Sequence, residues 1–260
     1  MDVSRADSPE PDGRAGRVAR RGLGWWIGAV ALGVLAAWVT MTIVVAWTRW
    51  GRFDPNLGSE ARESIGTQLS PAEHPWYFPI LTLHVMGALV ALGTCVFQIW
   101  PWLRRRHPRA HRYIGRVYVF AGVYPSCVAA LVVEAFWPFS VLTRIGQVVM
   151  ALLWGFTTTV GFVLRRQGRI ADHRRWMLRS FGFTCAALAE LAIQPIVPLL
   201  LAPEANTRFR GDPAILVPVT TAVQNWAAMV IVLLAVEGYL ERERLRRTAR
   251  RHRSSATAQP

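Results

Sequence analysis

The sequence predicts an all-α fold, a polytopic bundle of about six transmembrane helices with both termini in the cytoplasm. Hydrophobic residues make up 52% of the 260 residues, and the mean hydropathy is +0.25. Six apolar stretches each approach the roughly 20 residues that a spanning helix needs. The loops between them alternate between arginine-rich and arginine-poor, the pattern of a multi-pass protein. The expected spans lie near residues 23–47, 78–100, 114–137, 141–164, 177–202 and 214–240.

The chain begins with a basic tail, residues 1–22, and the first span follows at residues 23–47. We expect this span to be retained rather than removed as a signal peptide. Its apolar run of about 25 residues exceeds the usual hydrophobic region of about 7–15, and no convincing small-residue cleavage site follows it. Residues 48–77 form the one long external loop.

Proline and short connections shape the later spans. The connection at residues 138–140 is very short, so spans three and four are expected to form a tight hairpin. Pro125 is expected to interrupt span three, and Pro195 and Pro198 to break span five, because proline removes a helical hydrogen bond. An external loop near residues 203–213 precedes the last span. The transmembrane domain thus covers residues 23–240, and residues 241–260 form a second basic tail that starts as a helix.

The arginines fix the expected orientation. The chain has no lysine, and 24 of its 30 arginines lie in the two tails and in the loops after spans two and four, against 6 on the other side. The positive-inside rule then places both tails in the cytoplasm. The net charge of +14 reflects this topology rather than nucleic-acid binding, and the basic loops would attract anionic lipid headgroups. The candidate interfacial residues are Arg112, Arg116, Arg174 and Arg179.

Several kinds of chemistry lack their sequence signature. Cys95, Cys127 and Cys185 lie in three separate spans without a Cys-x-x-Cys pair, so neither a disulfide framework nor a zinc site is expected. The chain has no Gly-x-Ser-x-Gly, P-loop, His-Glu-x-x-His or dinucleotide-binding glycine motif. Hydrolysis and nucleotide-driven pumping are therefore not expected, and the sequence leaves open whether the protein is an enzyme.

Polar residues inside the spans follow helical faces. His84 and Gln98 share a face with small residues in span two, while Glu190 and Gln194 share one in span five. Small residues at this spacing suit a packing seam between helices. His84, Gln194 and Glu190 fit that interpretation poorly, because polar groups in a membrane are costly and often functional. At a rise of about 1.5 Å per residue, the three lie roughly 9, 12 and 18 Å below the outer boundary. They could form a proton relay, a cation site or a satisfied polar contact.

His111 and His173 open spans three and five from the cytoplasmic side, each followed by arginine. One interpretation is an interfacial polar belt, with arginines that reach toward the headgroups. The alternative is a cofactor pair, because imidazole is a good ligand for a transition metal or haem iron. Two histidines at one depth on separate helices supply the minimum for a bis-histidine haem b. No other metal site is expected.

A series of motif residues runs from span two to span five. They are His84, Gly87, Gly93, Gln98, Arg104, Pro108, His111-Arg112-x-x-Gly115-Arg116-x-Tyr118, Trp154 and His173-Arg174-x-Trp176-Met177-x-Arg179-Ser180. With these residues, the stretch from His84 to about Glu190 resembles a bacterial family of predicted membrane proteins catalogued as a domain of unknown function, family 2306. The resemblance implies a multi-helix membrane protein and supplies no activity, and we expect the bacterial inner membrane as its location. In that family an arginine is common near the position of Glu190, and this departure weakens the polar cluster described above.

Three function classes remain open. The first is a small redox protein with one haem between His111 and His173, similar to cytochrome b561-type reductases in helix number and histidine content only. The second is a small-solute or proton-coupled transporter that uses His84, Glu190 and Gln194. The third is a non-catalytic membrane assembly protein whose polar stripes seal the bundle. Membrane lipids are the expected partners, and the sequence leaves the oligomeric state open.

Overall fold

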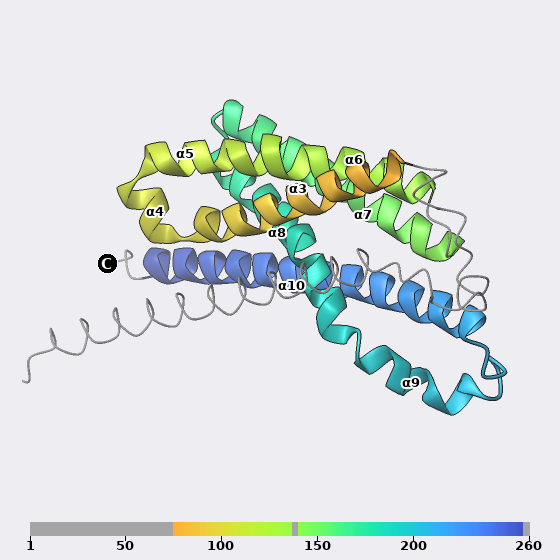
Figure 1. The fold of residues 1–260 in the computed structure, drawn as a ribbon. Coiled ribbons are helices and arrows are strands. Elements are labelled where there is room, and N and C mark those ends of the chain that lie inside the picture. The colour runs from red at the N-terminus through yellow and green to blue at the C-terminus, as the bar shows by residue number, and fades with distance from the viewer. Residues whose placement is uncertain (1–74, 137–139, 257–260) are drawn as a thin grey trace, which may run out of the picture. The chain divides into compact units, whose positions relative to one another are not determined.

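The computed structural model describes residues 75–136 and 140–256, and within these every regular element is a helix. Figure 1 shows their arrangement. In chain order they are α3 (Tyr77–Ile99), α4 (Pro101–Arg106), α5 (Pro108–Arg116), the π-helix η1 (Val117–Val123), α6 (Tyr124–Ala135), α7 (Val141–Arg166), α8 (Ile170–Ile193), α9 (Ile196–Ala205) and α10 (Pro213–Ala256).

Five helical segments in the described residues are long and apolar enough to cross a membrane by length and composition. The predicted all-α, multi-pass fold is therefore confirmed. The first expected span, residues 23–47, lies outside the described residues. The five segments are Pro79–Ile99, Pro108–Ala135, Val141–Arg166, Ile170–Ile193 and Ile215–Ala249.

Two spans begin earlier than hydropathy indicated. The helix expected from residue 114 starts at Pro108, and the helix expected from residue 177 starts at Ile170. Both early turns are rich in arginine and histidine, which lower hydropathy although arginine is a good helix former. Pro108 occupies the first turn, where its missing N–H costs nothing. The same effect extends α10 beyond residue 240, through an arginine-rich segment to Ala256.

The prolines act differently from one another. Pro125 lies in the first turn of α6, and the chain stays helical through it because the π-helix η1 widens the preceding turn. A π-helical turn is one of the known ways in which a helix accommodates such a disruption. By contrast, α8 ends at Ile193, and α9 starts after Pro195. The expected span at residues 177–202 is therefore two helices.

The long helices pack mainly on their neighbours in the chain. The most extensive contacts join α7 to α8, α8 to α10, and α3 to η1 and α6. Figure 1 shows α8 crossing the other long helices obliquely on its way to α9. Large apolar side chains cover the outside, as Leu152 and Phe156 on α7 and Leu234 on α10 are all more than half exposed. This apolar exterior is what contact with lipid requires.

The helices α3 and η1 approach each other closely at two glycines. A Cβ atom on Gly122 would lie 2.9 Å from the backbone nitrogen of Ala91 and 3.0 Å from its Cα. An ideal Cβ on Gly87, which lies one turn before Ala91, would be 3.0 Å from the carbonyl oxygen of Gly122. Backbone cannot move aside as a flexible side chain can, so glycine at both positions sets the spacing of this pair.

Gly122→Ala should therefore lower the thermal unfolding temperature in detergent, with a loss of about 1–3 kcal/mol typical of overpacking. Gly93→Ala is the matched control, since its Cβ would meet nothing within 4 Å. That substitution should leave stability unchanged or raise it by up to about 1 kcal/mol through helix propensity. Equal unfolding temperatures for the two variants would contradict the close-approach argument.

Candidate functional site

A hydrogen-bond network of buried side chains lies between η1, α7 and α8. The Tyr118 hydroxyl lies 2.6 Å from Ser180 Oγ and 2.8 Å from Thr184 Oγ1. Thr158 Oγ1 lies 2.6 Å from the same Ser180 oxygen, and the Trp154 indole N–H donates to Thr184 Oγ1 at 3.1 Å. Tyr118, Ser180 and Thr158 are at most 1% exposed. With each hydroxyl paired, the network joins three helices without a charged group.

The sequence reasoning did not assemble this network. Tyr118, Trp154 and Ser180 belong to the motif that carried the family resemblance, although nothing in the motif showed that they meet. A further signal was available in the spacing: Trp154 and Thr158 lie one helical turn apart, as do Ser180 and Thr184. Such pairs share a helix face, so two polar faces on consecutive spans were candidates for contact.

His84 is held by α6. Its Nδ1 lies 3.0 Å from the carbonyl oxygen of Ser126 and 3.1 Å from Ser126 Oγ, and that hydroxyl donates to the carbonyl of His84 at 2.9 Å. The bond to a carbonyl fixes the proton on Nδ1 and leaves the lone pair on Nε2. Within the described residues, no hydrogen bond or ion pair joins His84 to Glu190 or Gln194.

Gln98 and Gln194 each link one helix to another. The side-chain N–H of Gln98 donates to the carbonyl of His111 at 2.9 Å, which ties α3 to α5. The Gln194 side chain is exposed, while its carbonyl, at the end of α8, accepts a hydrogen bond from the Gln224 side chain at 3.1 Å. His84, Gln98 and Gln194 thus each make hydrogen bonds to a different partner.

A different pair of carboxyl groups comes together at the end of the bundle opposite α4 and α5. Glu134 on α6 lies within electrostatic range of Glu190 on α8 and of Arg144 on α7. Glu134 Oε2 is buried and has no hydrogen-bond partner among the described residues. Arg144 lies inside the span expected at residues 141–164 and is one of the six arginines on the arginine-poor side. In the structure Arg144 lies in the first turn of α7 and is only partly exposed.

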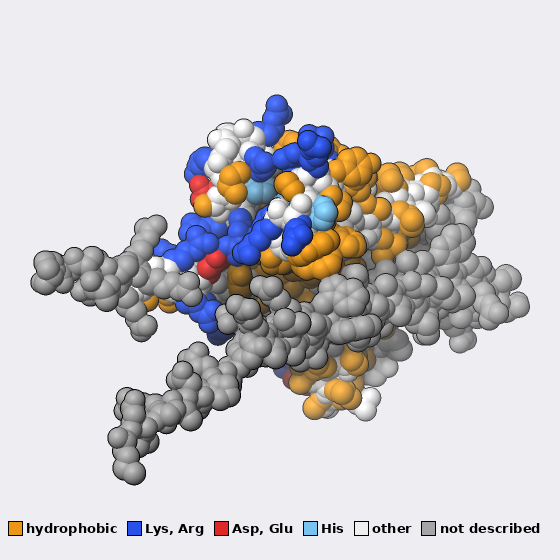
Figure 2. Space-filling view, turned by 90° about the vertical axis from the view of Figure 1, so that its left-hand side faces the viewer, with side chains coloured by type: hydrophobic (Ala, Val, Ile, Leu, Met, Phe, Trp, Pro, Cys, Tyr) orange, Lys and Arg blue, Asp and Glu red, His pale blue; other side chains and the backbone are white. Residues whose placement is uncertain are grey.

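At the arginine-rich end, His111 and His173 lie within electrostatic range of each other. His173 Nδ1 is 2.7 Å from the carbonyl oxygen of Gly161 on α7, so that Nδ1 carries the proton and Nε2 keeps its lone pair. His111 Nδ1 is buried and has no hydrogen-bond partner in the part of the chain that the structure describes. Figure 2 views this end and shows histidine surface among arginine side chains.

The four candidate interfacial arginines divide into two pairs. Arg112 and Arg116 on α5 are exposed. Arg174 and Arg179 instead bridge α8 to α10. Arg174 Nη1 lies 2.5 Å from Glu243 Oε1, and Arg179 Nε lies 2.6 Å from Glu237 Oε1.

The family model for predicted membrane proteins, DUF2306, matches residues 81–235, which is more than half of the chain. The chain belongs to this family. The DUF2306 region runs from α3 into α10 and contains the hydroxyl network, both carboxyl groups and all three partly buried histidines. No curated protein and no solved structure matches the chain significantly.

Tyr118→Phe tests the central network of this DUF2306 protein. The change removes one hydroxyl and leaves the shape of the side chain, so it should lower the free energy of unfolding by about 1 kcal/mol. Tyr113→Phe is the matched control, because Tyr113 is 69% exposed. Unfolding in detergent with increasing denaturant measures both. A Tyr118→Phe protein as stable as the control would show that the network contributes little.

Proposed function

We propose that this protein is a redox protein of the cytoplasmic membrane that holds one haem b between α5 and α8 through His111 and His173. When bound, the iron of such a group would cycle between its ferric and ferrous states and pass one electron at a time. The observation that carries the proposal is the state of the two imidazoles, each of which has a ring nitrogen without a hydrogen-bond partner among the described residues.

His173 has the environment of a metal-binding histidine. Metal-ligating histidines almost always donate their other ring N–H to a carbonyl or carboxylate, which fixes the tautomer and the ring orientation. The hydrogen bond from His173 Nδ1 to the Gly161 carbonyl, at 2.7 Å, is of this kind. Gly161 also permits the close approach of the helices, because a Cβ there would lie 2.7 Å from Met177 Sδ.

His111 supplies the second nitrogen. A buried polar atom without a partner is costly and needs an explanation, and His111 Nδ1 is such an atom among the described residues. A ligand shared with His173 would provide one. The two side chains come from different helices and lie within electrostatic range of each other, as a group bound between α5 and α8 requires.

The surrounding charge suits a group that carries carboxylates. Arg104, Arg112 and Arg165 all act electrostatically on His111, and Arg165 also acts on His173. Haem b bears two propionates, and arginine is the side chain best suited to bind carboxylates in two-point fashion. The residues present therefore match both the iron and the propionates of haem.

The purified protein, expressed with a haem precursor, should show a Soret band that shifts on reduction with dithionite. His111→Ala and His173→Ala should each abolish most of that band because each removes one iron ligand. His107→Ala is the matched control, since His107 is exposed on the same arginine-rich connection and should leave the spectrum unchanged. A colourless wild-type protein would refute the proposal.

The orientation follows from the same arginines. We infer that the arginine-rich end, with both chain termini, faces the cytoplasm, in accordance with the positive-inside rule. The haem would then lie near the cytoplasmic surface, within reach of soluble electron donors, and the Glu134 end would face outward.

The buried carboxyl pair favours a second candidate function, proton handling at the outer end. Glu134 lies within electrostatic range of a second carboxyl group, that of Glu190, and of the guanidinium of Arg144. In a medium of low dielectric constant an uncompensated charge is costly. The group is electroneutral when one carboxyl holds a proton, so it would bind one exchangeable proton between α6 and α8.

Infrared difference spectroscopy should detect that proton as the stretching band of a protonated carboxyl group. Glu134→Gln and Glu190→Gln should each remove the band, because a proton shared between two carboxyl groups needs both of them. Glu241→Gln is the control at an exposed glutamate on α10 and should preserve it. A band that survives in both test variants would exclude a shared proton at this site.

A further inference from the structure

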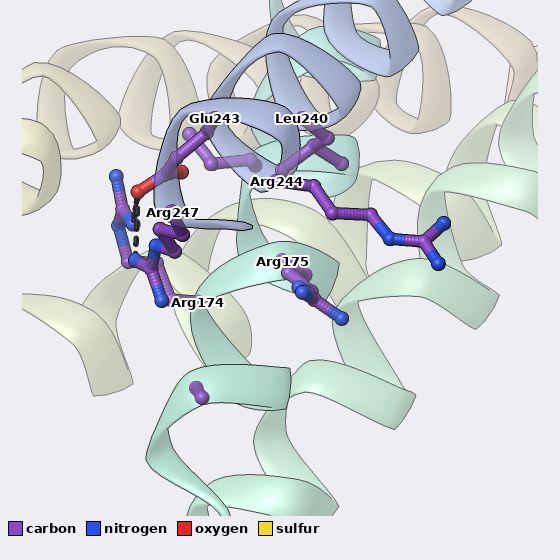
Figure 3. Close-up of a pocket in the computed structure, with 8 residues that line it drawn as sticks. Arg174, Arg175, Leu240, Glu243, Arg244 and Arg247 are labelled. Carbon is purple, nitrogen blue, oxygen red and sulfur yellow. Dashed lines mark hydrogen bonds and ion pairs between the residues drawn. The ribbon is translucent and has the colours of Figure 1, made fainter. Parts of the chain in front are cut away.

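A groove between α8 and α10 lies at the arginine-rich end, apart from the two histidines. It is a shallow groove, open to the outside, with a cavity volume of about 30 Å³, and it is shown in Figure 3. The first turns of α8 form one wall, and the C-terminal half of α10 forms the other. Its lining consists of Ala171, Arg174, Arg175, Leu178, Leu240, Glu243, Arg244 and Arg247.

The single acid in the groove is already neutralised. Glu243 Oε1 accepts hydrogen bonds from Arg174 Nη1 at 2.5 Å and from Arg247 Nη2 at 2.7 Å. Two arginines are thereby fixed on one side of the groove, as the dashed lines in Figure 3 mark. Four arginines against one glutamate leave the lining with a net charge of +3, which favours an anion.

The other two arginines have unused donors. Arg175 makes no hydrogen bond or ion pair within the described residues. Arg244 has Glu241 as its carboxylate partner at 3.7 Å, with both side chains more than half exposed, and such a pair contributes little. Figure 3 shows Arg175 and Arg244 extending toward the same open side of the groove from different helices. Two guanidinium groups so placed suit the oxygens of a phosphate.

The apolar part of the lining lies on the membrane side of the arginines. Leu178 is one turn farther into α8 than Arg174 and Arg175, and Leu240 is one turn before Arg244 in α10. Both leucines therefore lie toward the middle of the spanning helices, while the arginines lie toward their ends. A ligand that fits this order has an anionic head and apolar chains.

We propose that this groove binds an anionic phospholipid, with Arg175 and Arg244 on the phosphate and Leu178 and Leu240 against the first part of the acyl chains. Basic pockets between spanning helices are suited to such headgroups. The ion pairs of Glu243 hold Arg174 and Arg247 in the lining, so the site is prepared before the lipid arrives. The proposal is independent of haem binding.

The test uses the full-length protein in nanodiscs of phosphatidylcholine with a minor fraction of phosphatidylglycerol, and native mass spectrometry counts the retained anionic lipid. The wild type should enrich phosphatidylglycerol. The double variant Arg175→Gln/Arg244→Gln should lose about tenfold or more of that preference, since each arginine near the surface contributes a large factor. Arg175→Lys/Arg244→Lys should keep part of it because the charge remains while the planar contact is lost.

Arg105→Gln/Arg109→Gln is the matched control, with the same change of charge at two exposed arginines on α4 and α5. It should change the preference about twofold at most. An equal loss in both double variants would overturn the proposal and indicate a diffuse basic surface.

A second experiment uses inorganic phosphate. If phosphate raises the unfolding temperature of the detergent-solubilised wild type as much as phosphatidylglycerol does, the site takes a free anion, and the lipid assignment fails. The unfolding temperatures of the glutamine variants are measured in the same experiment, so that a loss of lipid preference is separated from a loss of folding.

Discussion

Hydrocarbon offers no hydrogen bonds, and the inside of this bundle is arranged around that constraint. A polar side chain in a spanning helix must find its partner on the helix itself or on a neighbour. In this bundle the partners lie on neighbouring helices. Ser126 hydrogen-bonds His84, the Gly161 carbonyl accepts from His173, and Tyr118 hydrogen-bonds Ser180 on α8. Each of these bonds fixes the rotation of one helix against another. The positions of the carboxyl pair and the histidine pair depend on those rotations.

The two ends of the bundle have different chemistry, and the polar network between them carries no charge. One end holds imidazoles and arginines, and the other holds carboxyl groups with a single arginine nearby. The hydroxyl network lies between them and is almost completely excluded from solvent. Under the two proposed functions, the electron would be handled at one end of this membrane domain and the proton at the other.

Hydropathy was sufficient to predict the fold class, because spanning helices are long and apolar. It placed the start of the third span at residue 114 instead of Pro108 because arginine and histidine resemble loop residues on a hydropathy scale. The central network was beyond reach for a different reason. A serine or threonine in a helix can bond its own preceding turn, as Thr94 does with the Val90 carbonyl. The sequence alone does not tell which hydroxyl, such as that of Ser180, reaches across. The approach of Glu134 to Glu190 and Arg144 was beyond reach for a similar reason, because it depends on how three helices rotate against one another.

The π-helix η1 changes the direction in which the side chains of the third span face. A uniform α-helix turns by about 100° per residue, so the wider turn at Val117–Val123 offsets every later side chain relative to the pattern set by α5. The half before η1 packs on α3, while the half after it packs on both α3 and α7. The side chains of α6 therefore face directions that differ from those expected if the pattern of α5 continued through the helix. A bound drug or lipid that converted η1 to a regular α-helix would rotate Glu134 relative to His111 about the helix axis without bending the helix. The two ends of the bundle would then be coupled by this rotation.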